Sequence, residues 1–126
     1  MIQAQTLVNI ADNSGSKLGR CIRVGQGYQN RWSSCGELIL ISVQKLRKKR
    51  KFKPKVQKGE VVRGVVLRTK AKFRRKNSNF VQFHENAIAL VNAQLRPLGT
   101  RVLGPVTREL RNTKFMKVAS LSGDFV

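Results

Sequence analysis

Residues 37–45 are Glu37-Leu38-Ile39-Leu40-Ile41-Ser42-Val43-Gln44-Lys45, and this stretch decides the fold class. Ile39, Ile41 and Val43 alternate with their neighbours, which places three branched side chains on one face of an extended chain. A period of two over this length is typical of a β-strand that is buried on one side. The stretch therefore predicts a half-buried strand.

Further short apolar runs lie on both sides of this strand, separated by residues that favour turns. Asp12-Asn13-Ser14-Gly15 ends the first run, and Lys58-Gly59 precedes a run rich in valine. Gly25 and Gly27 end the second run. Five or more short strands at this spacing indicate a mainly β fold built on a small closed barrel. The additional predicted strands are residues 7–10, 21–24, 61–67 and 87–91.

The C-terminal part, residues 104–121, has a different pattern. Gly104-Pro105 places a proline where the first turn of a helix tolerates one. Val106 and Leu110 lie four residues apart, and Asn112-Thr113 are suitable N-cap residues for a second helix. Two short helices packed on the barrel are predicted. The chain has no internal repeat and no linker rich in serine or glycine, so residues 1–126 are predicted to form one domain.

Positive charge dominates the composition. The chain has 26 lysines and arginines against six acidic residues, and its formal net charge is +20. Two segments, residues 45–58 and 68–79, hold most of the excess, and the apolar residues 80–83 predict that the second segment belongs to a hairpin. A small domain with this self-repulsion is expected to bind a polyanion, and nucleic acid is the expected partner. The cations are Lys45, Arg47, Lys48, Lys49, Arg50, Lys51, Lys53, Lys55 and Lys58 in the first segment, and Arg68, Lys70, Lys72, Arg74, Arg75 and Lys76 in the second.

Two other interpretations of these segments were weighed. A solvated loop is the usual meaning of a charged run, but two such runs flanked by strands favour contact with phosphates. Binding to a membrane surface would require an apolar face at helical spacing, which neither run has. No apolar stretch approaches the roughly 20 residues that span a bilayer. We therefore expect no membrane partner.

The eight aromatic residues bear on how RNA would be recognised. Phe52 and Phe73 interrupt the basic segments, where each could stack on a base or anchor a hairpin. Phe80, Phe83 and Phe115 are at positions expected for core residues. With so few rings left to stack on bases, we expect recognition of a folded RNA by its shape and phosphates.

Catalysis and metal binding have little support. Cys21 and Cys35 are expected to be free thiols, and a zinc site would need more ligands than His84 and these cysteines supply. His84 beside Glu85 could act as a general base, but no nucleophile or second carboxylate has a suitable spacing. No phosphate-binding glycine motif is present. We expect no cofactor and no enzymatic activity.

Four blocks of sequence resemble the large-subunit ribosomal protein family called L-fourteen, in its bacterial or organellar form. The most specific is Gly99-Thr100-Arg101-Val102-Leu103-Gly104-Pro105-Val106-Thr107-Arg108-Glu109-Leu110-Arg111, followed by Lys114-Phe115-Met116-Lys117. The chain departs from the family at Asn77-Ser78, where an Asp-Gly or Asn-Gly turn is usual, and in the longer, more basic residues 47–55. The other matching blocks are residues 1–15, residues 58–69, and Phe83 with Asn86-Ala87.

The resemblance implies a five-stranded closed β-barrel with a protruding β-hairpin and a short C-terminal helical segment. It implies a structural constituent of the large ribosomal subunit that binds large-subunit rRNA directly. Its implied partners are small-subunit rRNA across the intersubunit bridge, neighbouring proteins of the L-nineteen and L-three families, and a ribosome-silencing factor. The departures, which include the C-terminal residues 122–126, and the lack of a presequence favour a protein encoded and used in a mitochondrion over one from a plastid or a bacterial cytoplasm.

In the most specific block, the arginines are expected to contact rRNA or the subunit bridge, and Glu109 is expected to pair with one of them. Two rival functions remain at this stage. The first is a free single-strand nucleic-acid-binding barrel, which predicts exposed rings on the barrel face. The second is a small RNA-modifying or hydrolytic enzyme centred on His84. The arginines of the most specific block, named above as candidates for contact with rRNA or the subunit bridge, are Arg101, Arg108 and Arg111.

Overall fold

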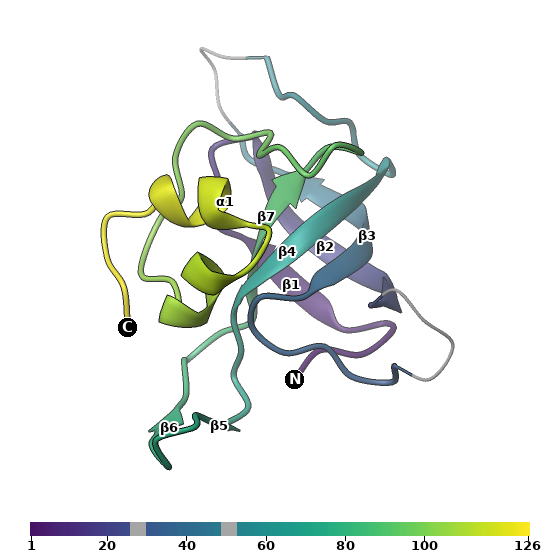
Figure 1. Ribbon diagram of the computed structural model, residues 1–126. Helices are drawn as coiled ribbons and strands as arrows, with labels where there is room; N and C mark the ends of the chain where they lie inside the picture. The colour runs from purple at the N-terminus through teal and green to yellow at the C-terminus, as the bar shows by residue number, and fades with distance from the viewer. Residues whose placement is uncertain (26–29, 49–52) are drawn as a thin grey trace.

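A computed structural model describes residues 1–25, 30–48 and 53–126. Five of its strands form a closed barrel in the order β1-β2-β3-β4-β7, and the remaining two form a separate hairpin (Figure 1). The predicted mainly β fold with a closed barrel and a protruding hairpin is confirmed. No helix in the described ranges is long and apolar enough to span a membrane. The barrel strands are β1 (Leu7–Ile10), β2 (Ser16–Val24), β3 (Leu38–Leu46), β4 (Val61–Arg68) and β7 (Ala87–Val91).

The barrel closes where its first and last strands meet. Neighbouring strands are antiparallel except at this seam, where β1 and β7 run parallel. Only two pairs of residues face each other there, Asn9 with Ala87 and Ile10 with Ile88. A seam this short leaves backbone groups of β7 beyond it without a strand partner, so they need another acceptor.

The carboxylate of Asp12 supplies that acceptor. Asp12 is 1% exposed, and its Oδ2 accepts a hydrogen bond of 2.7 Å from the Leu90 backbone N–H. Its Oδ1 accepts from the backbone N–H and the hydroxyl of Ser14, which fixes the turn that leads into β2. The predicted turn at residues 12–15 is therefore confirmed, and its first side chain also extends the barrel seam.

The barrel interior is filled by branched side chains that leave no room beside them. Ile41, from the stretch that predicted the first strand, and Ile88 are both fully buried. A Cβ placed on Gly19 would lie 2.6 Å from Ile41 Cδ1, and one on Gly64 would lie 2.9 Å from Ile88 Cδ1. In a barrel of only five strands, large residues fit only where small ones face them. Val61, the first residue of the predicted strand 61–67, is exposed at the start of β4.

The C-terminal segment covers the outer face of β4 and β7 (Figure 1). It contains a 3₁₀-helix, η1 (Arg108–Asn112), and a short α-helix, α1 (Met116–Ser120). Leu110 and Val118 pack there with Val65 and Leu67 in a second apolar cluster. This cover explains why the last five residues of β4 are all buried instead of alternating.

Two details of the predicted helices are wrong. Gly104-Pro105 does not begin a helix, because Val106 is extended and pairs with Phe125. The Val106 N–H donates to the Asp124 carbonyl and its carbonyl accepts from the Val126 N–H, so neither group is free for a helical bond. The N-cap of α1 is Phe115 rather than Asn112 or Thr113, and it has no side-chain capping bond.

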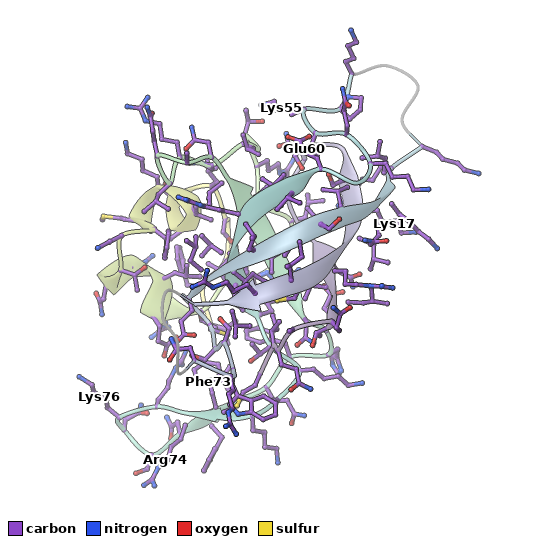
Figure 2. All side chains as sticks on the ribbon, turned by 90° about the vertical axis from the view of Figure 1, so that its right-hand side faces the viewer. Lys17, Lys55, Glu60, Phe73, Arg74 and Lys76 are labelled. Atoms are coloured by element: carbon purple, nitrogen blue, oxygen red, sulfur yellow. The ribbon has the colours of Figure 1, made fainter. Side chains whose placement is uncertain are left out.

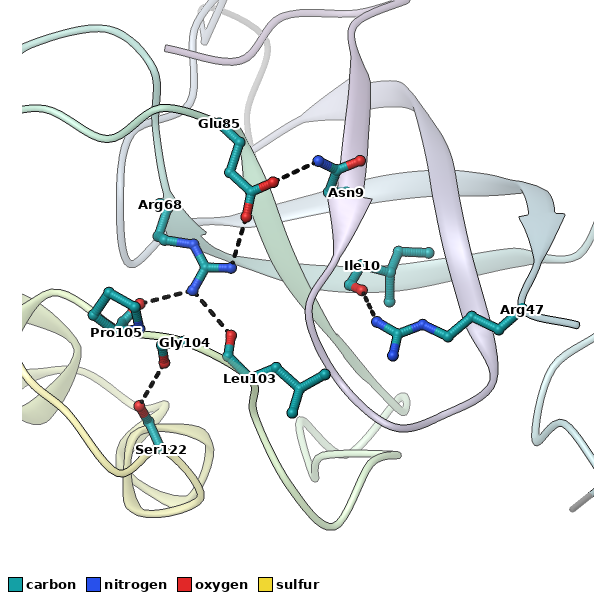
Figure 3. A network of polar contacts seen from close by, with 9 residues as sticks. All are labelled: Asn9, Ile10, Arg47, Arg68, Glu85, Leu103, Gly104, Pro105 and Ser122. Carbon is teal, nitrogen blue, oxygen red and sulfur yellow. Dashed lines mark hydrogen bonds and ion pairs between the residues drawn. The ribbon is translucent and has the colours of Figure 1, made fainter. Parts of the chain in front are cut away.

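Arg68 joins the barrel to this C-terminal segment (Figure 3). The side chain lies at the end of β4 and the residue is 6% exposed. Its guanidinium donates to the carbonyls of Leu103 and Pro105, both at 3.0 Å, and to Glu85 at 3.0 Å. Glu85 accepts a further hydrogen bond from the Asn9 side chain of β1. Gly104 leaves space for this arrangement, since its φ is +84° and a Cβ there would lie 2.5 Å from Arg68 Nη1.

The hairpin projects from one end of the barrel (Figure 1). It consists of β5 (Phe73–Arg74) and β6 (Phe80–Val81), and its turn has one residue, Ser78, at a φ of +64°. The Ser78 N–H donates to the Arg75 carbonyl and the Arg75 N–H donates to the Asn79 carbonyl. This is a type I turn followed by a left-handed residue, not the type I′ turn that Asn-Gly would favour.

The expected core phenylalanines have three different outcomes. Phe115 is buried as predicted, and Phe83 is partly buried. The prediction for Phe80 is wrong, because its side chain is 65% exposed. A two-stranded hairpin outside the barrel has no second layer to cover its rings.

We predict that Asp12→Asn lowers the free energy of unfolding by about 2–4 kcal/mol, because the amide nitrogen would face backbone N–H groups that need an acceptor. Denaturant titration of the purified chain measures the loss. Asp124→Asn is the matched control, since this carboxylate lies in an exposed residue, and it should change stability by less than about 0.5 kcal/mol. Equal effects of the two substitutions would refute the role of Asp12.

We predict that Arg68→Met lowers the free energy of unfolding by about 2–4 kcal/mol, because two carbonyls lose their donor and Glu85 loses its partner. The matched control is Arg101→Met at an exposed arginine. Hydrogen exchange should also show that residues 103–107 lose protection before the barrel strands do. If both variants unfold at the same denaturant concentration as the parent chain, Arg68 does not hold the segment in place.

Candidate nucleic-acid interface

The described residues of the two basic segments lie at opposite ends of the barrel (Figure 1). In Figure 2, Lys55 of the first segment lies at one end, and Arg74 and Lys76 of the second lie at the other. Only β4 separates the segments in sequence, but its eight residues cross the barrel over about 26 Å, at roughly 3.3 Å per residue. The segments therefore form two distinct cationic surfaces rather than one patch.

Most of the cations predicted to contact phosphate are exposed. Lys49, Arg50, Lys51 and the nearby Phe52 lie outside the described residues. Within the described part of the first segment the exposed cations are lysines, and those of the hairpin segment include one arginine. The three arginines of the C-terminal block are exposed too. The exposed predicted residues are Lys45, Lys48, Lys53, Lys55, Lys58, Lys70, Lys72, Arg74, Lys76, Arg101, Arg108 and Arg111.

Three of the predicted arginines bind other parts of the protein instead. Arg68 is the buried residue described above. Arg47 donates to the carbonyls of Ile10 at 2.9 Å and Ser16 at 3.2 Å, which ties the end of β3 to β1 and β2 (Figure 3). The planar guanidinium suits such positions because it donates several bonds in fixed directions. Most of the predicted cations that are exposed in the described residues are lysines.

Arg75 is the third of these arginines, and it links the hairpin to the C-terminal segment. Its Nε donates to Glu109 Oε1 at 2.5 Å, and its Nη2 donates to Glu109 Oε2 at 3.1 Å and to the Val126 carbonyl. The expectation that Glu109 pairs with an arginine of its own block is therefore wrong. The hairpin brings Arg75 to this carboxylate across 34 positions of sequence, which no local pattern indicates.

A recess of about 920 Å³ lies beside the ends of β1 and β3. Lys17, Lys45, Lys48 and Lys58 line it, with Glu85 as the carboxylate among its lining residues. The excess of ammonium groups makes this recess attractive to a phosphate. Lys17 was missed at the sequence level because it lies outside both basic segments. With Arg20 and Arg23 it is one of the exposed cations of β2, but the predicted strand covered only residues 21–24 and so left Lys17 out.

Two arginines lie over aromatic rings. The Arg111 guanidinium is 3.8 Å from the centre of the Phe125 ring, which orients an exposed cation at the surface. The Arg75 guanidinium is 6.0 Å from the centre of the Phe73 ring. Phe73 is partly buried at the base of the hairpin, an arrangement that favours an anchor over a stacking platform.

The described residues contain no cluster of side chains suited to metal binding. Both cysteines are free as predicted, and burial raises the pKa of the Cys21 thiol and of the Cys35 thiol, so each stays protonated at neutral pH. Cys35 Sγ lies 3.6 Å from the Thr69 hydroxyl. His84 is exposed, and no three histidine, cysteine or acidic side chains of the described residues cluster as metal ligands.

A comparison with protein-family models agrees with this geometry. The model described as ribosomal protein L14p/L23e matches residues 1–126, which is the whole chain. Together with the barrel, the hairpin and the exposed cations, this match identifies the family and implies a structural role in the large ribosomal subunit. The chain belongs to the ribosomal protein L14p/L23e family.

Proposed function

We propose that this protein binds large-subunit rRNA directly, with one cationic surface at each end of the barrel, and has no catalytic activity. The observation that supports it best is the placement of exposed lysines and arginines at both ends of a rigid barrel. Two surfaces about one strand length apart would bind two separate elements of folded RNA. The protein would thereby hold those elements at a fixed distance.

Electrostatics supports RNA as the neutralising partner. The described residues form two ion pairs, Arg68 with Glu85 and Arg75 with Glu109. The six acidic residues of the chain cannot neutralise its 26 lysines and arginines, so a net charge of +20 remains for an external polyanion to neutralise. Phosphates bind ammonium and guanidinium groups strongly and release condensed counterions when they do so. The lysines that line the recess beside β1 and β3 would hold one such phosphate.

We further propose that the C-terminal segment faces other components of the ribosome. Arg101, Arg108 and Arg111 would contact rRNA, including small-subunit rRNA across the intersubunit bridge. Neighbouring proteins of the L-nineteen and L-three families follow from the resemblance, whereas the departures from the family pattern favour the mitochondrial matrix as the compartment. A recess of about 800 Å³, where Met116 is exposed beside Lys114 and Lys117, supports a protein contact such as a ribosome-silencing factor.

A free single-strand-binding barrel is less well supported. That function requires rings exposed on the strands of the barrel. Among the described residues, the exposed large aromatic side chains are Trp32, in the connection between β2 and β3, and Phe80, in the hairpin. Neither belongs to a barrel strand.

Reversing three hairpin charges together, with Lys72→Glu, Arg74→Glu and Lys76→Glu, should weaken rRNA binding at raised salt. The variant spares Arg75, whose bonds to Glu109 hold the hairpin. Loss of three phosphate contacts should reduce the slope of log affinity against log salt by about 2–3. The measurements are salt titration with an rRNA fragment and sedimentation of large subunits that carry the tagged chain.

The matched control keeps the charges, with Lys72→Arg, Arg74→Lys and Lys76→Arg, and should bind as the parent chain does. A second triple variant, Lys48→Glu, Lys53→Glu and Lys58→Glu, tests the opposite end and spares Lys55, which donates to the Leu98 carbonyl. If the two ends bind separate RNA elements, the two losses should add. An unchanged salt slope in the hairpin variant would contradict this assignment.

A further inference from the structure

Trp32, the single tryptophan of the chain, is 54% exposed. It lies in the connection between β2 and β3, outside both basic segments. A ring of this size is among the most favourable side chains to bury, and the exposed Ile22 lines the same recess, so the two side chains together indicate a contact surface. The two cation–π contacts found among the described residues involve Phe73 and Phe125, so they do not engage this ring.

The backbone beside Trp32 is held firmly. The next residue, Ser33, is fully buried and forms an antiparallel bridge with Ile2. The Ile2 N–H donates to the Ser33 carbonyl at 2.8 Å, and the Ser33 N–H donates to the Ile2 carbonyl at 2.7 Å. The indole is therefore presented from a fixed position, so a ligand that contacts it would not need to order this backbone.

The surroundings of Trp32 combine apolar and cationic groups. Ile22, Arg23 and Arg31 are exposed and line the same recess of about 710 Å³ as Trp32. The residues that line this recess include no carboxylate. An aromatic face beside two guanidinium groups matches a nucleotide, whose base stacks and whose phosphates accept hydrogen bonds. An uncharged protein segment would leave both arginines without a partner.

The strand topology places this recess at the hairpin end of the barrel. Strands β2 and β4 are both antiparallel to β3, so their C-terminal ends lie at the same end of the barrel. Trp32 follows β2 and the hairpin follows β4. RNA bound along the hairpin would therefore continue toward Trp32.

We propose that Trp32 stacks on one unpaired base of the rRNA, while Arg23 and Arg31 bind the phosphates on either side of that nucleotide. The inference rests on the proposed rRNA binding and adds to it a preference for an unpaired base. A stacked base inside duplex RNA has no free face for the indole, so a regular helix cannot satisfy this site. Stacking of one base on an aromatic ring corresponds to a change in affinity of about tenfold.

The test uses two blunt-ended RNA duplexes that differ only by one bulged nucleotide, with the full-length chain as the protein. The parent chain should bind the bulged RNA about tenfold more tightly than the regular one. Since Trp32 is the only tryptophan, its emission reports the contact directly and should be quenched by the bulged RNA alone. Trp32→Leu should bind both RNAs equally, whereas Trp32→Phe should keep most of the preference.

The outcomes separate this proposal from the broader one. If the chain binds both RNAs equally and its emission does not change, the stacking site is refuted while rRNA binding stands. A preference for the bulged RNA that survives in Trp32→Leu refutes it too. Failure to bind either RNA at any salt concentration would overturn both proposals. The variant with reversed hairpin charges should bind more weakly yet keep its preference, because its substitutions leave Trp32 unchanged.

Discussion

The closure of the barrel between β1 and β7 is the constraint on which the rest of the structure depends. That seam has only two facing residue pairs, and the buried Asp12 carboxylate extends it by bonding the Leu90 N–H and fixing the turn into β2. Without closure, β1 and β7 would have free edges. One buried carboxylate therefore joins the seam of the barrel to the turn that leads into β2.

The antiparallel order of the strands also decides where the charges lie. Consecutive strands of the barrel run in opposite directions, so the loops that follow them alternate between its two ends. The basic segments on either side of β4 are therefore held apart, although they are close in sequence. Arg47, Arg68 and Arg75 bind carbonyls or carboxylates and join elements of the fold, while exposed lysines supply most of the remaining charge.

Sequence patterns predicted the parts of the fold that depend on local periodicity. The alternation at Ile39, Ile41 and Val43 and the turn at residues 12–15 both appear as expected. Predictions failed where a distant segment supplies the partner. Val106 was predicted to be helical, but it is extended because it pairs with Phe125. Glu109 is bound by an arginine from the hairpin and not by one of its own block. Phe80 is exposed because no second layer covers the hairpin.

The sequence by itself determined the class of fold, the strong positive charge and the family, because each depends on residue type and order. The tertiary structure alone decided which cations are free. Arg68 and Lys70 are two residues apart, yet one is buried against carbonyls and the other is exposed. It also decided that Trp32 stands exposed beside Arg23 and Arg31. Whether a side chain is buried, and which group it binds, depends on which segments meet in space. Barrel closure brings together residues that are far apart in the chain.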